Sequence, residues 1–226
     1  MRNWEVLRHA ALLLGWGCAA GVALAAGGHH GVDDAAILEP GTCELETWFT
    51  RAGAGERLLH AGAGCRVGPV ELGVAAERAR DPSGHATGYG LQVKWATEVA
   101  PGLSAGVSVS SGWQAHVRPR YQGTTVSGLL TWAVRDDVAL HANVGRDLVH
   151  GAPDLNRSGV AVEWTPKTGW SLMAERYVES ATQFVRAGAR WTATENFTVD
   201  LSRAHSLRGP GPSNWTLGAT WLIDRR

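Results

Sequence analysis

Apolar and polar residues alternate strictly along most of the chain. Within residues 90–113, Leu91 and Val93 share one face of an extended chain, whereas Gln92 and Lys94 share the other. This follows because successive side chains of a strand point to opposite sides. The alternation stops at a Pro-Gly turn and then resumes, which predicts a β-hairpin with one apolar and one wet face.

About twelve such segments follow one another, and no segment has a sustained apolar face at helical period. Tight turns and longer links alternate between them, as expected when short turns on one side of an outer membrane face longer loops on the other. The sequence therefore predicts an all-β fold, a transmembrane antiparallel β-barrel of about 12 strands. The expected strands are 42–51, 56–67, 70–80, 89–100, 104–116, 124–134, 138–150, 157–166, 170–180, 184–193, 197–207 and 214–224.

The apolar parity is expected to face lipid and the polar parity to face the lumen. The chain has 11 tryptophans, many on apolar faces near strand ends, which is typical of the aromatic girdles of membrane barrels. A water-excluding core could not hold so many charges on the other parity, whereas a hydrated barrel interior can. The candidate lumen residues are Glu44, Glu71, Lys94, Glu98, Glu163, Glu175, Arg186, Arg190 and Asp200. These side chains either select the solute that passes through the lumen, or pair with one another across the lumen and stabilise the barrel. Both alternatives are open.

Four arginines share the apolar parity, each a few residues before an expected outer loop. They are Arg78, Arg146, Arg176 and Arg203. An arginine on the lipid face costs about 2–4 kcal/mol at mid-bilayer but about 0–1 near the interface, so this parity predicts a position at the outer rim. There they would either contact lipopolysaccharide phosphates or extend toward water as ordinary interfacial side chains.

The N-terminus predicts export. Residues 1–25 combine basic residues, a short apolar run and small residues at its end, which is typical of a cleaved signal peptide. Residues 26–41 would form a periplasmic leader and residues 42–226 the barrel. Cleavage after Ala26 would leave Gly-Gly-His at the new terminus, where His29, with His30 beside it, could bind Cu(II) or Ni(II); cleavage after Ala25 would spoil that chelate. The alternative is a flexible polar leader.

Two cysteines remain after the expected signal peptide, Cys43 and Cys65. A hairpin turning at residues 52–55 places Cys43 opposite Cys65, and the same register places Phe49 opposite Leu59. Directly opposed Cβ atoms are close enough for a disulfide, which an exported chain can keep. Two buried free thiols are the alternative.

The catalytic constellations expected of barrel enzymes are missing from the pattern. His205 and Ser206 are adjacent and therefore point to opposite sides of a strand, so they cannot act as a pair. No phosphate loop or nucleotide fingerprint is present, and a formal net charge of +0 gives no attraction to nucleic acid. We predict no enzyme activity and no cofactor.

The stretch HHGVDDAAILEPGTCELETWFTR, residues 29–51, resembles proteobacterial outer-membrane barrels of the transporter-like, phenol-degradation-associated group. The shared elements are Asp33-Asp34, Pro40-Gly41 and Glu44-Leu45-Glu46. The chain departs from many outer-membrane barrels in ending Asp224-Arg225-Arg226 instead of in an aromatic residue.

The resemblance implies an outer-membrane barrel that passes or binds small solutes through a charged lumen. A structural barrel that anchors a periplasmic partner through residues 26–41 is the alternative, and a lipid-modifying barrel enzyme is a further one. The expected partners are outer-membrane lipid, lipopolysaccharide and a small solute.

Overall fold

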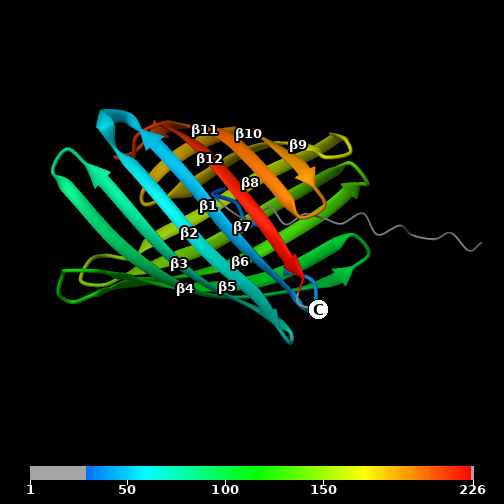
Figure 1. Cartoon of the computed structure of the whole chain (residues 1–226), viewed down its shortest axis with the longest axis horizontal. Helices are drawn as coiled ribbons and strands as arrows, with labels where there is room; N and C mark the ends of the chain where they lie inside the picture. The colour runs from blue at the N-terminus through cyan, green and yellow to red at the C-terminus, as the bar shows by residue number, and fades with distance from the viewer. Residues whose placement is uncertain (1–28, 225–226) are drawn as a thin grey trace, which may run out of the picture.

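The computed structural model describes residues 29–224, which form a closed barrel of twelve antiparallel strands (Figure 1). Each strand pairs with its neighbours in sequence, and β1 pairs with β12 to close the barrel. The predicted fold class is confirmed. The strands are β1 Thr42–Ala52, β2 Arg57–Val67, β3 Val70–Asp81, β4 Gly84–Ala100, β5 Leu103–Gln114, β6 Tyr121–Arg135, β7 Val138–Val149, β8 Leu155–Lys167, β9 Trp170–Glu179, β10 Thr182–Thr194, β11 Phe197–Arg208 and β12 Asn214–Asp224.

The two ends of the barrel differ in their connections. At the short-turn end, β1 begins, β12 ends, and the turns near residues 68, 101, 136, 168 and 195 join successive strands. At the long-loop end, the other connections run through residues 53–56, 82–83, 115–120, 150–154, 180–181 and 209–213. In outer-membrane barrels the short turns are periplasmic, so we expect the long-loop end to face the cell exterior.

The outer surface carries an apolar belt, because most outward residues in the middle of the strands are exposed aliphatic or aromatic side chains. This is the surface that a bilayer would cover, and it agrees with the predicted outer-membrane location. Tryptophans lie near both borders of this belt, but more of them lie near one border than near the other. Trp215 lies toward the long-loop end, whereas Trp132, Trp164, Trp170, Trp191 and Trp221 lie toward the short-turn end. Among residues 29–224 no helix is long and apolar enough to cross a membrane.

One connection differs from the sequence prediction. Residues 81–88 were expected to form a long loop, but β3 and β4 stay paired up to Asp81 and Gly84. The Asp81 carboxylate accepts hydrogen bonds from the backbone N–H groups of Ser83 (2.7 Å) and Gly84 (2.9 Å), which closes a tight turn. Polar residues that resemble a loop in sequence are here the end of a long hairpin.

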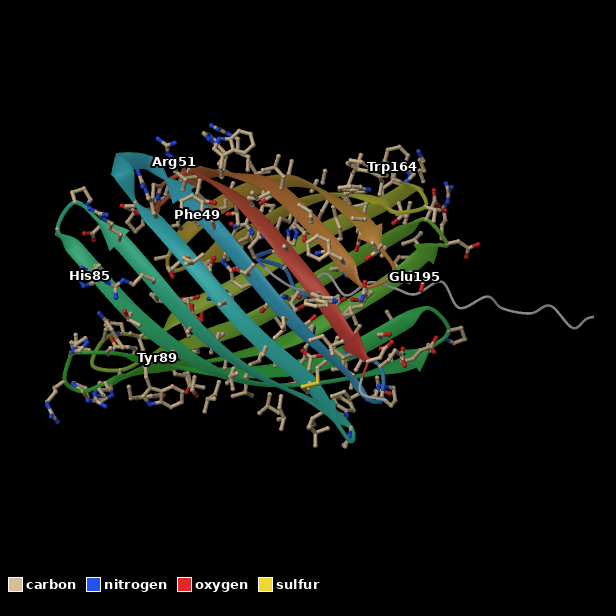
Figure 2. The ribbon with its side chains drawn as sticks, viewed as in Figure 1. Phe49, Arg51, His85, Tyr89, Trp164 and Glu195 are labelled. Atoms are coloured by element: carbon tan, nitrogen blue, oxygen red, sulfur yellow. A yellow bond between two sulfur atoms is a disulfide. The ribbon has the colours of Figure 1, made fainter. Side chains whose placement is uncertain are left out.

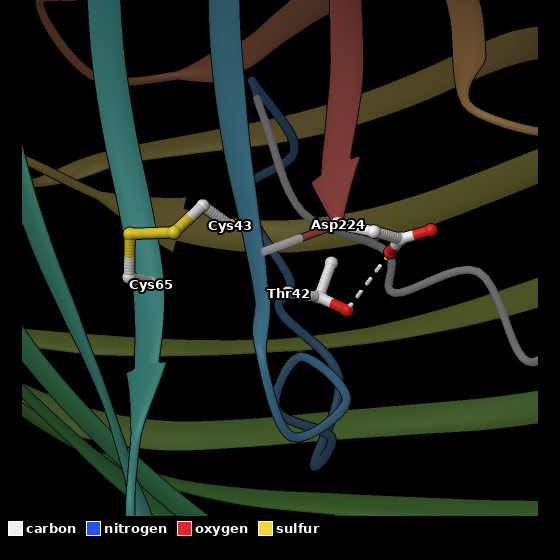
Figure 3. Close-up of a disulfide and its surroundings, with 4 residues drawn as sticks. All are labelled: Thr42, Cys43, Cys65 and Asp224. Atoms are coloured by element: carbon white, nitrogen blue, oxygen red, sulfur yellow. Dashed lines mark hydrogen bonds between the residues drawn. A yellow bond between two sulfur atoms is a disulfide. The ribbon is translucent and has the colours of Figure 1, made fainter. Parts of the chain in front are cut away.

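The hairpin of β1 and β2 has the predicted register. Cys43 lies opposite Cys65 and the two form a disulfide (Figure 3). In the same register Phe49 lies opposite Leu59. The disulfide is confirmed, and the free-thiol alternative is excluded. On the far side of β1, the Thr42 hydroxyl donates a hydrogen bond to Asp224 at 3.4 Å, so the ends of the first and last strands meet at the barrel seam.

Candidate functional site: the barrel lumen

The leader crosses the lumen. Residues 29–41 precede β1 and lie inside the barrel, where they contact the inner wall from β11 round to β2 (Figure 1, dark blue). We expected a leader in the periplasm, but the described part of it is folded into the barrel. Its backbone N–H groups find acceptors on the wall, which is what permits a segment without secondary structure to be buried. Residues 1–28, which include the predicted signal peptide, lie outside the described residues.

Glu175 on β9 is the main acceptor for the leader. Its carboxylate accepts hydrogen bonds from the N–H groups of Gly31 (3.2 Å) and Val32 (2.9 Å). Arg186 on β10 pairs with the same carboxylate at 3.1 Å and donates to the carbonyl of His29. Glu175 is only 3% exposed, so its charge is balanced by these donors instead of by water.

An apolar contact accompanies these polar ones. Val32 has no exposed surface and packs in a cluster with Tyr177 and Phe184, which point into the lumen. A Cβ atom on Gly31 would overlap the Tyr177 ring, so only glycine allows the leader to lie this close to the wall.

The two leader histidines contact the wall. The Nε2 atom of His29 lies 2.7 Å from the Ser202 hydroxyl, and the His30 ring lies 3.6 Å from Glu175 and 4.0 Å from Asp200. Burial, together with the nearby charges of His30 and Arg186, lowers the pKa of His29 to about 3, so this imidazole is neutral. Within residues 29–224 no group of three or more side chains is arranged to hold a metal ion, and the amine of the predicted chelate lies outside the described residues.

The rest of the leader is bound on the opposite wall. Lys94 on β4 pairs with Asp33 at 2.9 Å and with Asp34 at 3.0 Å. Farther along, Glu71 accepts a hydrogen bond from the N–H group of Leu38 at 3.0 Å. We call the wall residues that hold the leader the leader site: Glu71, Lys94, Thr131, Glu175, Arg186, Asp200 and Ser202.

A second region of the lumen is left empty by the leader. It is a polar cavity of about 350 Å³ against the inner wall of β1 to β6. We call it the open cavity; its chemistry comes from Glu44, Glu46, Trp48, His60, Glu77 and Gln92, with Ser108, Ser110 and Thr125 beyond them. A separate vestibule of about 640 Å³ opens at the long-loop end, between the β1–β2 and β3–β4 hairpins.

His60 organises the middle of the open cavity. Its ring stacks on Trp48 with centroids 3.4 Å apart, and its Nδ1 atom lies 3.0 Å from Glu77. Its Nε2 atom faces Glu46 at 3.6 Å, beyond hydrogen-bond distance, and has no hydrogen-bond partner. Sequence reasoning did not select Trp48 or His60, although Trp48 has the inward parity of Glu44 and could have been found from it.

The nine predicted lumen residues therefore divide into groups. Glu44 lines the open cavity, and Glu71 borders it while binding the leader. Glu163 lies 3.6 Å from His141, and Glu98 sits at the short-turn end, where it accepts a hydrogen bond from the Gly102 N–H. The remaining five surround the leader: Lys94, Glu175, Arg186, Asp200 and Arg190, the last paired with Asp200 at 2.6 Å.

The four predicted rim arginines all lie exposed on the outer face of different strands. Arg146 pairs with Asp154 at 3.4 Å, and Arg78 donates a hydrogen bond to Thr87 at 2.9 Å. The Arg203 guanidinium lies 4.9 Å from the centre of the Trp215 ring. They do not form one contiguous group.

Comparison with known sequences identifies one protein family. The sequence profile of one family, described as Uncharacterised conserved protein UCP029691, matches residues 15–222. No curated protein sequence matches the chain.

Three solved structures, two porins and a toluene transporter, have a fold similar to that of this barrel. The KdgM porin in complex with disordered oligogalacturonate matches with a TM-score of 0.60 and 9% identity, over 80% of this chain and 98% of that one. The NanC porin matches with a TM-score of 0.60 and 7% identity, over 79% and 98%. The Ralstonia pickettii toluene transporter TbuX matches with a TM-score of 0.55 and 11% identity, over 84% and 79%.

Proposed function

We propose that this chain, which belongs to the UCP029691 family, is a narrow outer-membrane channel for small polar solutes with a preference for cations. The observation that carries the proposal is the open cavity: it is lined by charged and hydroxyl side chains and lies beside the leader within a barrel whose outside is apolar. Such a lumen offers water and polar contacts to a solute that the membrane excludes.

The preference for cations follows from which charged side chains of the lumen are already held in ion pairs. Lys94 is paired with two leader carboxylates, and Arg157 is paired with Asp147 at 3.1 Å and Glu179 at 2.9 Å. The carboxylates of Glu44, Glu46 and Glu77 line the cavity, and His60 lies 3.6 Å from Glu46 and 3.0 Å from Glu77. The open cavity is therefore net acidic.

The similar solved structures support passage of solutes but not a particular one. Their titles name a porin with oligogalacturonate and a toluene transporter, which are chemically unlike each other. None of these titles describes an enzyme. Since residues 29–41 are engaged inside the barrel, the structure offers no support for the alternative in which the leader anchors a periplasmic protein.

The test is conductance in planar bilayers. The chain beginning at Ala26 is refolded and compared with a chain that lacks residues 26–38, under a salt gradient that reports ion selectivity. We expect small, cation-selective steps from the first and larger steps from the second, because removing the leader widens the lumen. If neither chain conducts although both fold, the channel proposal is wrong.

A further inference from the structure

A row of basic residues crosses six strands on the outer face at the long-loop end. Following the register from β11 to β4, each of its members lies directly opposite the next: Arg203, Trp215, Arg51, Arg57, Arg80 and His85. We call this set the basic row. Figure 2 shows Arg51 and His85 at the same end of the barrel, away from Trp164 and Glu195. Sequence separation hides the row, because its members are spread over more than half of the chain.

The basic row lies at the border of the apolar belt. Arg51 has the same outward parity as Phe49, and Arg57 has that of Leu59, both of which are exposed on the belt. All members of the row are exposed. Because the next residues along each strand lead into the connections of the long-loop end, the guanidinium groups lie at the height of lipid head groups and not of acyl chains.

The arginines at the centre of the row have no anionic partner in the part of the chain that the structure describes. Arg51, Arg57 and Arg80 form no ion pair with any carboxylate of residues 29–224. The nearby Asp81 carboxylate is occupied by its own turn. Like charges directly opposite each other on a sheet are unfavourable, so three adjacent arginines raise the energy of the barrel unless an anion lies between them.

The other end of the barrel has a different composition. There the outward residues include five tryptophans, and the one arginine of the β6–β7 turn, Arg135, is paired with Asp137 at 3.0 Å. An outer membrane is asymmetric in the same way: its outer leaflet carries the phosphates of lipopolysaccharide. Guanidinium groups bind phosphate through two parallel hydrogen bonds, and Trp215 beside Arg203 adds the aromatic surface common at such interfaces.

We propose that the basic row binds the phosphate groups of lipopolysaccharide in the outer leaflet. The row supplies the counter-charge for several phosphates at once, and those phosphates remove the repulsion between its arginines. This inference goes beyond the proposed channel function and does not depend on it, because the row has the outward parity of its strands, although Arg57, Arg80 and His85 also border the vestibule.

The experiment measures thermal unfolding of the refolded barrel in a neutral detergent, with and without purified lipopolysaccharide. The variant carries Arg51→Gln, Arg57→Gln and Arg80→Gln together. The matched control carries Arg118→Gln, Arg120→Gln and Arg208→Gln, which removes the same charge from the same end of the barrel but outside the row. Inorganic phosphate replaces lipopolysaccharide in a parallel series.

We expect lipopolysaccharide to raise the unfolding temperature of the wild type and of the control equally, and to raise that of the row variant by less than half as much. Without lipopolysaccharide the row variant should unfold at the same or a higher temperature than the wild type, because like charges have been removed. Three outcomes would overturn the proposal: equal stabilisation of all three proteins, an equal effect of inorganic phosphate, or a row variant that is the least stable in detergent alone.

Discussion

The leader site and the open cavity are built from the same kinds of residues, but the leader occupies the first and leaves the second empty. Both present inward carboxylates and cations from alternating strand positions. In the leader site these groups bind the chain's own backbone, as Glu175 binds Gly31 and Val32. In the open cavity they face space, as Glu46 does beside His60. For these two carboxylates, contact with the leader is the difference between a buried structural charge and one that a solute can reach.

Glu175→Gln should show the largest difference between the two regions. Losing this charge leaves Arg186 buried without its carboxylate, and breaking a buried pair costs about 3–5 kcal/mol. We expect the leader to leave the wall, so that conductance rises toward that of the chain lacking residues 26–38 while the unfolding temperature falls. Glu44→Gln, in the open cavity, is the matched control and should leave both quantities close to the wild type. Equal effects of the two substitutions would remove the distinction between the regions.

Gly31→Ala should have the next largest effect. Its Cβ atom would overlap the Tyr177 ring, and such overpacking costs typically about 1–3 kcal/mol. We expect a partly displaced leader, seen as frequent switching between small and large conductance levels in single-channel records. The control is Gly73→Ala, whose Cβ atom would meet Gln92 at an ordinary 3.5 Å beside the open cavity. Steady wild-type conductance in Gly31→Ala would show that the close approach does not hold the leader.

Changing the charge of the open cavity should alter selectivity without releasing the leader. The double substitution Glu46→Gln and Glu77→Gln should reduce the cation-to-anion permeability ratio by roughly two- to thirtyfold, because two screened carboxylates at about 0.2–1 kcal/mol each contribute about 0.4–2 kcal/mol together. The measurement is the reversal potential under a salt gradient. Glu98→Gln should not change it, since Glu98 accepts a hydrogen bond in the β4–β5 turn. A shift in Glu98→Gln as large as in the double variant would contradict the assignment of the selective region.

Reduction of the disulfide should have the smallest effect on conduction. Cys43 and Cys65 have the outward parity of Leu45, so their bond lies on the lipid side of the wall and away from both lumen regions. We expect the reduced barrel to unfold at a lower temperature, because the bond restricts the unfolded chain, while its conductance and selectivity stay unchanged. Altered conductance after reduction would show that the β1–β2 hairpin positions the lumen groups.

The barrel, its inward and outward faces and the disulfide were all predictable from the amino-acid sequence. Alternation with a period of two assigns each residue to a face, and the hairpin of residues 42–67 is local enough that its turn sets the register of Cys43 and Cys65. The inward parity of Glu44, Glu175 and Asp200 was also predictable in this way.

The role of those inward residues depends on the tertiary structure. The position of the leader is set by contacts between residues far apart in the sequence, such as Val32 with Glu175, and no local pattern reports them. Barrel closure likewise completes the basic row, because it brings β12 beside β1 and so places Trp215 opposite Arg51. Parity fixes the face of each side chain, but closure and the path of the leader decide its neighbours, and the neighbours determine whether a charge is paired, buried or free to bind.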